Sequence, residues 1–273
     1  MDLDWLLDLA GGLRWTALQK LQLNPEETQV QLDCTLEQLE LLWTRHQQDH
    51  VPLQHLVGRC PWRDLELRVS PDVLIPRQET ELLAELAFAK AAEVEQILEP
   101  EGRAWADLGT GSGALAVALA RELPDWHGYG VDCSPAALAV AQTNLDRWAP
   151  DVSCQLLHGS WWEPLRPWWG TLQLVVSNPP YIPAAIVDRL DPVVRDHEPR
   201  LALDGGGDGL RACRALISGA GEALAPGGWL LIEHHHDQSE AVLELMISAG
   251  LLEVHAAKDL EGIQRFALAR RAG

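Results

Sequence analysis

The sequence lacks three features that would assign it to particular protein classes. No apolar run reaches the roughly 18 residues that a membrane-spanning helix needs, and the opening MDLDWLLDLA has no basic stretch of the kind that begins a secretory signal. Its 5 cysteines include no CxxC pair, which favours neither a disulfide framework nor a zinc site. We therefore expect a cytoplasmic protein with reduced thiols.

Basic residues are also scarce. Lys and Arg number 21 against 40 Asp and Glu, which gives a net charge of −19. Such a charge repels nucleic acid unless the basic residues cluster, so the expected partner is a protein, with no direct nucleic-acid or membrane contact. With 273 residues, 47% of them hydrophobic, the chain can form one large core and a small second domain.

A short apolar run that ends in Asn-Pro-Pro-Tyr is the clearest sign of a binding site. The run from Leu172 to Val176 has the pattern of a strand buried on both faces of a parallel sheet. Pro179 and Pro180 cannot donate to a strand ladder, so the strand should end at Asn178 and leave carbonyl groups without ladder partners. The Asn178 amide offers an acceptor and two donors, and the ring of Tyr181 can cover a planar group. Although these dipeptides also occur in ordinary turns, their place at a strand's carboxyl end predicts a receptor for a planar NH2 group.

A glycine-rich loop follows an earlier predicted strand, Arg103 to Leu108. Glycines let the backbone approach a ligand closely, and the N-terminus of the following helix favours a negative group. The residues predicted to bind a cofactor here are Gly109, Thr110, Gly111, Ser112 and Gly113. Because Gly109, Gly111 and Ala114 also fit the dinucleotide pattern G-x-G-x-x-G/A, the loop alone leaves a dehydrogenase open as an alternative.

Two further residues are candidates for cofactor binding. Asp132 ends a predicted strand about twenty residues after the loop, where its carboxylate can accept from the ribose hydroxyls of either cofactor. Trp161 follows the next predicted strand and can lie against adenine, but among 12 tryptophans a packing role fits equally well. Ser134 and Pro135 have the residue types of a helix N-cap and first turn, which is a structural role.

The chain divides into a small helical unit and a larger α/β domain. Residues 1–60 show helical spacing of leucines, with a capping-box pattern at Thr35 and Gln38 that begins a helix ending near residue 49. Residues 61–76 form the predicted hairpin and linker, in which Trp62 to Val69 alternates as a half-exposed strand. Residues 77–273 form the predicted catalytic domain, beginning with a helix that runs to about Leu98.

Strand and helix patterns alternate through the rest of the chain. They predict a helix to Leu224, a strand over 228–233, a helix over 237–249, and strands over 251–257 and 263–269. The segment 182–210 has little periodicity and is long for a structureless connection, which indicates a function, and such a loop can form one wall of the pocket. The fold class is α/β, with a doubly wound seven-stranded sheet.

The triplet His234, His235 and His236 does not predict a metal site. Consecutive residues on a strand point to alternate faces, and no cysteine or carboxylate completes a recognisable ligand spacing.

Several of these motifs resemble those of one enzyme family. The NPPY tetrapeptide resembles that of S-adenosylmethionine-dependent methyltransferases that modify amide or exocyclic amino nitrogens. PLQHLVG, LIPRQETE, Glu198-Pro199 and the Gly-rich run from Asp204 to Leu210 resemble the release factor glutamine methyltransferases. This chain departs from the family pattern at Ser160, His197 and His235, where Asp, an aromatic residue and Gly are commoner.

The resemblance implies a Rossmann-like class I methyltransferase sheet, whose last strand is antiparallel, with S-adenosylmethionine as cofactor. The implied substrate is the glutamine of the Gly-Gly-Gln motif in a peptide chain release factor. Asn178 and Pro179 would accept from its amide N–H groups, with Pro180 beside them and Tyr181 on the amide plane. Asn178 would also border the cofactor, and Trp161 would lie on adenine. A base-modifying methyltransferase, a dehydrogenase and a catalytically silent binding protein remain as alternatives.

Overall fold

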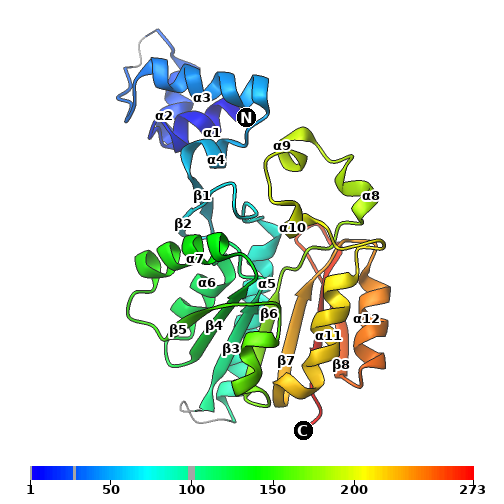
Figure 1. Cartoon of the computed structure of the whole chain (residues 1–273). Coiled ribbons are helices and arrows are strands. Elements are labelled where there is room, and N and C mark those ends of the chain that lie inside the picture. The colour runs from blue at the N-terminus through cyan, green and yellow to red at the C-terminus, as the bar shows by residue number, and fades with distance from the viewer. Residues whose placement is uncertain (1, 27–28, 98–101) are drawn as a thin grey trace.

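The computed structural model describes residues 2–26, 29–97 and 102–273, and it shows a group of short helices joined to a larger α/β body (Figure 1). The N-terminal helices are α1 (Asp2–Leu9), α2 (Trp15–Leu23), α3 (Leu36–Asp49) and α4 (Leu53–Val57). They share a small core in which Leu6, Leu39 and Leu53 are buried together. Burial of these leucines holds the helices together, since each is too short to be stable alone.

The predicted capping box of α3 is confirmed. The Thr35 hydroxyl accepts from the Gln38 backbone N–H at 3.2 Å, and the Gln38 side chain accepts from the Thr35 N–H at 2.9 Å. Helix α4 was not predicted. It lies within the PLQHLVG stretch and ends at Gly58, whose φ of 73° is left-handed, as is common just beyond a helix.

Strands β1 (Arg59–Trp62) and β2 (Leu65–Arg68) form the antiparallel hairpin between the two parts (Figure 1). The prediction that one strand begins at Trp62 and runs to Val69 was wrong, because the second arm begins only at Leu65. Trp62 pairs with Leu65 across the turn and therefore ends the first arm. The alternating pattern continued through the turn because both arms bury their apolar residues on the same side.

Within the described residues, seven further strands form one sheet in the order β5-β4-β3-β6-β7-β9-β8. Strand β9 is antiparallel to both of its neighbours, and the pairs among β3 to β7 are parallel, as the resemblance implied. The strands are β3 (Ala104–Leu108), β4 (His127–Asp132), β5 (Cys154–His158), β6 (Leu172–Ser177), β7 (Leu224–Glu233), β8 (Leu252–Lys258) and β9 (Gln264–Arg270).

Helices cover both faces of this sheet and enclose two cores. One core packs α5 (Glu79–Glu95), α6 (Ala114–Glu122) and α7 (Pro135–Trp148) on one face. The other packs η2 (Glu163–Trp168), α11 (Arg211–Ala223) and α12 (Ser239–Ser248) on the opposite face. The expected end of α5 at Leu98 lies outside the described residues. None of the helices in the described ranges combines the length and apolarity that crossing a membrane requires.

Every residue of β6 is buried, as the apolar run predicted. Leu174 and Val176 point into one core, while Val175 points into the other. The strand ends at Ser177, so Asn178 is the first residue beyond it. Likewise, Ser134 caps α7 by accepting from the Ala137 N–H, which confirms its structural role.

The segment 182–210 contains short helices that the sequence pattern did not predict. It contains the one-turn helices α8 (Ala184–Val187), α9 (Pro192–Arg195) and α10 (Arg200–Leu203), which lie at the same end of the body as the N-terminal helices (Figure 1). Pro183 and Pro199 stand directly before α8 and α10, and Pro192 is the first residue of α9, where its fixed φ suits the first turn. A helix of one turn is too short to produce apolar periodicity, which explains why the sequence pattern missed all of them.

Candidate active site

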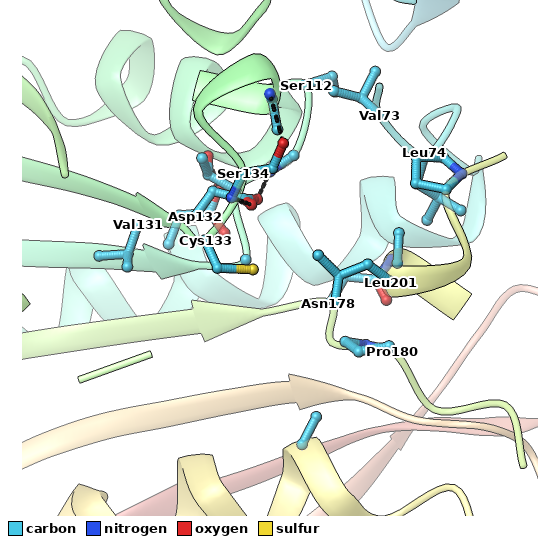
Figure 2. Close-up of a pocket in the computed structure, with 18 of the residues that line it drawn as sticks. Val73, Leu74, Ser112, Val131, Asp132, Cys133, Ser134, Asn178, Pro180 and Leu201 are labelled. Carbon is cyan, nitrogen blue, oxygen red and sulfur yellow. Dashed lines mark hydrogen bonds between the residues drawn. The ribbon is translucent and has the colours of Figure 1, made fainter. Parts of the chain in front are cut away.

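A cavity of about 360 Å³ opens where β3, β4, β5 and β6 end. Figure 2 shows Asn178 and Pro180 on one side of it and Ser112, Asp132 and Ser134 on the other. Its size lies within the usual range of small-molecule sites, and its place is the carboxyl edge of the parallel strands.

The glycine loop after β3 lines the cavity with four of its five predicted residues, namely Gly109, Thr110, Gly111 and Ser112. Gly109 and Gly111 have φ of 80° and 54°, a conformation that side chains disfavour. Gly113 is the exception, because it does not line the cavity. A Cβ added there would lie 3.0 Å from the Cβ of Ala141, so this glycine lets α6 pack closely on α7.

Asp107 is a buried acid at the cavity wall that the sequence reasoning missed. Its Oδ2 accepts from the Thr110 hydroxyl at 2.7 Å, while its buried Oδ1 has no hydrogen-bond partner among the described residues. Burial, more than the neighbouring Asp132, raises the pKa of Asp107 to about 7. A lone acid within an otherwise apolar strand, directly before a glycine loop, was the signal available in the sequence.

The unpartnered Oδ1 of Asp107 indicates whether the cavity residues suit S-adenosylmethionine. An unpartnered buried acceptor requires a donor, and the α-ammonium group of the methionine part is a charged one. The glycine loop next to it leaves backbone close to the same space. The donor and acceptor chemistry of this wall therefore fits the amino-acid end of that cofactor.

Asp132 lines the cavity at the end of β4, as predicted, but it also holds the loops around it. Its Oδ2 accepts from the Gly111 N–H at 2.9 Å, and its Oδ1 accepts from the Ser134 N–H at 2.9 Å. Each carboxylate oxygen keeps a further lone pair, so acceptance from ribose hydroxyls stays a prediction consistent with this geometry.

Trp161 and Trp162 separate into two roles. Trp162 is buried, and its indole N–H donates to the Leu216 carbonyl at 2.9 Å, so it is a core residue. Trp161 is half-buried, lines the cavity and has a left-handed φ of 48°, which is uncommon outside glycine. A Cβ on Gly109 would lie 3.3 Å from the Trp161 ring, so the ring forms a wall beside the loop. Its contact with adenine stays a prediction.

The NPPY tetrapeptide divides between the cavity and the interior. Asn178 and Pro180 line the cavity, whereas Pro179 and Tyr181 are not part of its wall. The Pro179 carbonyl accepts no hydrogen bond from the part of the chain that the structure describes, as the strand-ending argument predicted. The Tyr181 ring lies 6.2 Å from that of His235, and its stacking on a substrate amide stays a prediction.

A hydrogen-bonded chain connects Asn178 to the interior. The Asn178 side-chain NH2 donates to the Thr80 hydroxyl at 2.9 Å, and the Thr80 hydroxyl donates to Glu233 at 2.8 Å. The Tyr181 hydroxyl donates to the other oxygen of Glu233 at 3.3 Å. Thr80 lines the cavity, and neither it nor Glu233 was identified from the sequence.

The segment between β6 and α11 forms part of the cavity wall, as expected, through Pro199, Leu201 and Ala202. It is tied to the segment just before α5 by Glu198, which is 5% exposed. Arg77 donates to Glu198 at 2.6 Å, and Arg77 itself lines the cavity. This ion pair links the LIPRQETE and Glu-Pro motifs across 121 sequence positions.

The rings of His235 and His236 lie side by side, with their centroids 4.0 Å apart. His234 is buried at the end of β7, while His235 binds Asp237 through its ring Nδ1 at 2.6 Å. Across the described ranges, no group of three or more His, Cys, Asp or Glu side chains is arranged to hold a metal ion.

Comparisons with known proteins show which family the chain resembles. Residues 85–190 match the family model described as methyltransferase small domain. The chain is 56% identical to the release factor glutamine methyltransferase of Prochlorococcus marinus over 99% of this chain and 91% of the relative. It is 46% identical to that of Thermosynechococcus vestitus over 89% and 82% of the two chains.

A solved structure, the hMettl16 catalytic domain in complex with MAT2A 3'UTR hairpin 6, is similar in fold. Its TM-score is 0.58 at 13% identity, covering 94% of this chain and 91% of that one. At this identity the likeness concerns the fold alone, a Rossmann-like class I methyltransferase. The two curated relatives, by contrast, are similar over nearly the whole chain, and this protein therefore belongs to the release factor glutamine methyltransferase family.

Proposed function

We propose that the protein transfers a methyl group from S-adenosylmethionine to the side-chain amide nitrogen of the Gly-Gly-Gln glutamine in a peptide chain release factor. Together with membership of the family, one structural observation supports this proposal. The glycine loop and Asn178, on neighbouring strands, line the same cavity. A donor and a planar amide bound at these two walls would meet within one cavity.

An amide nitrogen is a poor nucleophile because its lone pair is delocalised into the carbonyl group. The site must therefore orient the amide and stabilise the positive charge that develops as the new N–C bond forms. The Asn178 Oδ1 and the Pro179 carbonyl, both acceptors without partners among the described residues, would take the two N–H groups. This holds the nitrogen lone pair toward the methyl donor without a strong base, and the proton leaves after transfer.

When bound, S-adenosylmethionine supplies an electrophilic methyl group and leaves as S-adenosylhomocysteine. Asp107 would hold its ammonium group, the backbone of Gly109 to Ser112 its carboxylate, and Asp132 its ribose, with Trp161 beside adenine. Pro180, Pro199 and Leu201 contribute apolar wall to this cavity.

The N-terminal helices would dock the large substrate. We assign residues 1–60 to a docking unit, 61–76 to the hairpin and linker, and 77–273 to the methyltransferase domain. One contact supports the docking role because it fixes the unit relative to the site. The His197 ring nitrogen lies 2.7 Å from the Asp49 carbonyl oxygen. A release factor held between the unit and the 182–210 segment would reach Asn178.

The rival functions fit less well. Membership of the family opposes a dehydrogenase, and the net charge of −19 opposes a nucleic-acid substrate. A cytoplasmic location follows from the proposed substrate, which works at the ribosome.

The test is methyl transfer from labelled S-adenosylmethionine to a purified release factor. We expect one methyl group on the Gly-Gly-Gln glutamine, located by mass spectrometry of the digested product. A release factor with that glutamine changed to Ala is the control and should stay unlabelled. Absence of transfer to the intact factor, with cofactor binding shown separately, would contradict the proposed substrate.

A further inference from the structure

The hydrogen-bonded chain behind Asn178 brings together three segments that are distant in sequence. Thr80 lies in the first turn of α5, Glu233 ends β7, and Asn178 follows β6. The Asn178–Thr80 bond spans 98 sequence positions, and the Thr80–Glu233 bond spans 153. Thr80 is 5% exposed and Glu233 is 2% exposed, so bulk water cannot replace either partner.

The ionised form of Glu233 fixes the orientation of the Asn178 amide. When Glu233 is ionised it only accepts hydrogen bonds, and its two oxygens accept from the Thr80 and Tyr181 hydroxyls. The single hydroxyl proton of Thr80 is then used, so Thr80 can offer Asn178 only a lone pair. The NH2 half of the Asn178 amide must face Thr80, and the Oδ1 half is left for another donor.

Without such a partner, an asparagine amide can turn by 180° at little cost, since its two halves have nearly the same shape. The turned amide would present N–H groups to the N–H groups of a substrate amide. That contact is repulsive, and it removes an acceptor from the developing positive charge.

Glu233 is costly to bury. Burial raises its pKa to about 7, and the hydrogen bonds from the Thr80 and Tyr181 hydroxyls are the main interactions that favour its ionised form. Arg265 contributes less, and its guanidinium binds Asp259 at 2.5 Å. A carboxylate kept in such a place is therefore better explained by what it orients.

We propose that Thr80 and Glu233 are positioning residues for methyl transfer. Glu233 orients the Thr80 hydroxyl, and Thr80 holds the Asn178 amide with Oδ1 toward the glutamine NH2 group. Tyr181 donates to the same carboxylate and steadies it from the NPPY segment itself. This inference rests on the proposed function, because it takes Asn178 as the contact to the substrate amide.

The test compares Thr80→Val, which keeps the shape but removes the hydroxyl, with Thr80→Ser, which keeps the hydroxyl. In single-turnover transfer with saturating cofactor, Thr80→Val should be slower by about 10²-fold, as expected for a misplaced catalytic group. KM for the release factor and Kd for the cofactor should change by less than about threefold. Thr80→Ser should stay close to the wild-type rate. Thr171→Val makes the same change near the start of β6, where the hydroxyl only binds the Trp168 carbonyl, and should not slow transfer.

A double-mutant cycle separates positioning through Asn178 from any other effect. If Thr80 acts through Asn178, Thr80→Val combined with Asn178→Ala should be no slower than Asn178→Ala alone. Should Thr80→Val fail to fold, Thr80→Ala and Glu233→Gln replace it, each with an expected loss of about tenfold or more.

Two results would overturn this inference. The first is a folded variant that lacks the Thr80 hydroxyl but transfers the methyl group at the wild-type rate. The second is a double variant in which the rate losses of the two single variants add. A wild-type rate for Asn178→Ala instead defeats the proposed role of Asn178, and no transfer by the wild type defeats the proposed function. A slow Asn178→Ala with a fast Thr80→Val defeats only the positioning role.

Discussion

The two sides of the cavity are built in different ways. The cofactor side uses residues close in sequence, since Asp107, Thr110 and Gly111 come from one strand and its loop, and Asp132 joins them across 21 positions. The acceptor side joins Asn178 to Thr80 and Glu233 across 98 and 153 positions. A buried carboxyl group lies on each side, and burial raises the pKa of both to about 7. The comparison predicts that the first side controls cofactor affinity and the second controls turnover.

Asn178→Ala should give the largest effect. It removes one of two acceptors near the developing charge, so kcat should fall by about 10²–10³, as for loss of one preorganised polar group. Cofactor affinity should change little. Single-turnover kinetics and calorimetric titration measure the two quantities, and a folded variant with wild-type kcat would end the acceptor-side assignment.

Asp132→Ala should act on the other side. Losing hydrogen bonds from a charged acceptor should weaken cofactor binding by about 1.5–3 kcal/mol, which is roughly 10- to 150-fold in Kd. Because the carboxylate also holds Gly111 and Ser134, some stability should be lost too. Calorimetry with S-adenosylmethionine checks the affinity, and an unchanged Kd would remove Asp132 from the site.

The two buried carboxyl groups predict how stability depends on pH. Their ordinary pKa values of 3.8 and 4.5 rise to about 7 in the folded protein. The native state therefore keeps both protons longer than the unfolded state, and each group lowers the free energy of unfolding as the pH rises toward 7. The loss approaches about 1.4 kcal/mol per pH unit for each group.

Urea denaturation of the cofactor-free protein at about pH 5.5 and pH 8 tests this linkage. Relative to wild type, Asp107→Asn should gain stability as the pH rises, because it has no charge to bury. Saturating S-adenosylmethionine should remove the Asp107 contribution but not that of Glu233. If the free energies of unfolding of Asp107→Asn and wild type differed by the same amount at both pH values, the raised pKa of Asp107 would be refuted.

His197→Ala should give the smallest effect. It removes the contact with the Asp49 carbonyl that joins the 182–210 segment to α3. Because the bond is exposed, we expect its loss to weaken release factor binding by only about 0.5–1.5 kcal/mol, which would be measured as a modest rise in KM for the release factor. Cofactor Kd should not change. If both constants worsened together, the N-terminal helices would not act on substrate docking alone.

Local features were predictable wherever the cause lies within a few residues. The apolar run of β6 predicted a fully buried strand, the prolines predicted its end, and the Thr35 capping box predicted the start of α3. The glycine loop predicted a backbone that approaches a ligand, although Gly113 serves helix packing. The one-turn helices of the 182–210 segment escaped prediction because a single turn has no period.

What the tertiary structure alone decided was which polar atoms meet. In the sequence, Asp107 is simply one acid in a predicted strand. The packing around it leaves its Oδ1 buried beside the cavity, without a hydrogen-bond partner in the described part of the chain. Thr80 reads as part of a helix start and Glu233 as a strand end. Their bond to each other and to Asn178 exists because α5 packs against β6 and β7, and a hydrogen bond forms only when atoms come within about 3 Å. Apolar patterns specify which faces are buried, but they carry no record of which two distant side chains that burial brings together.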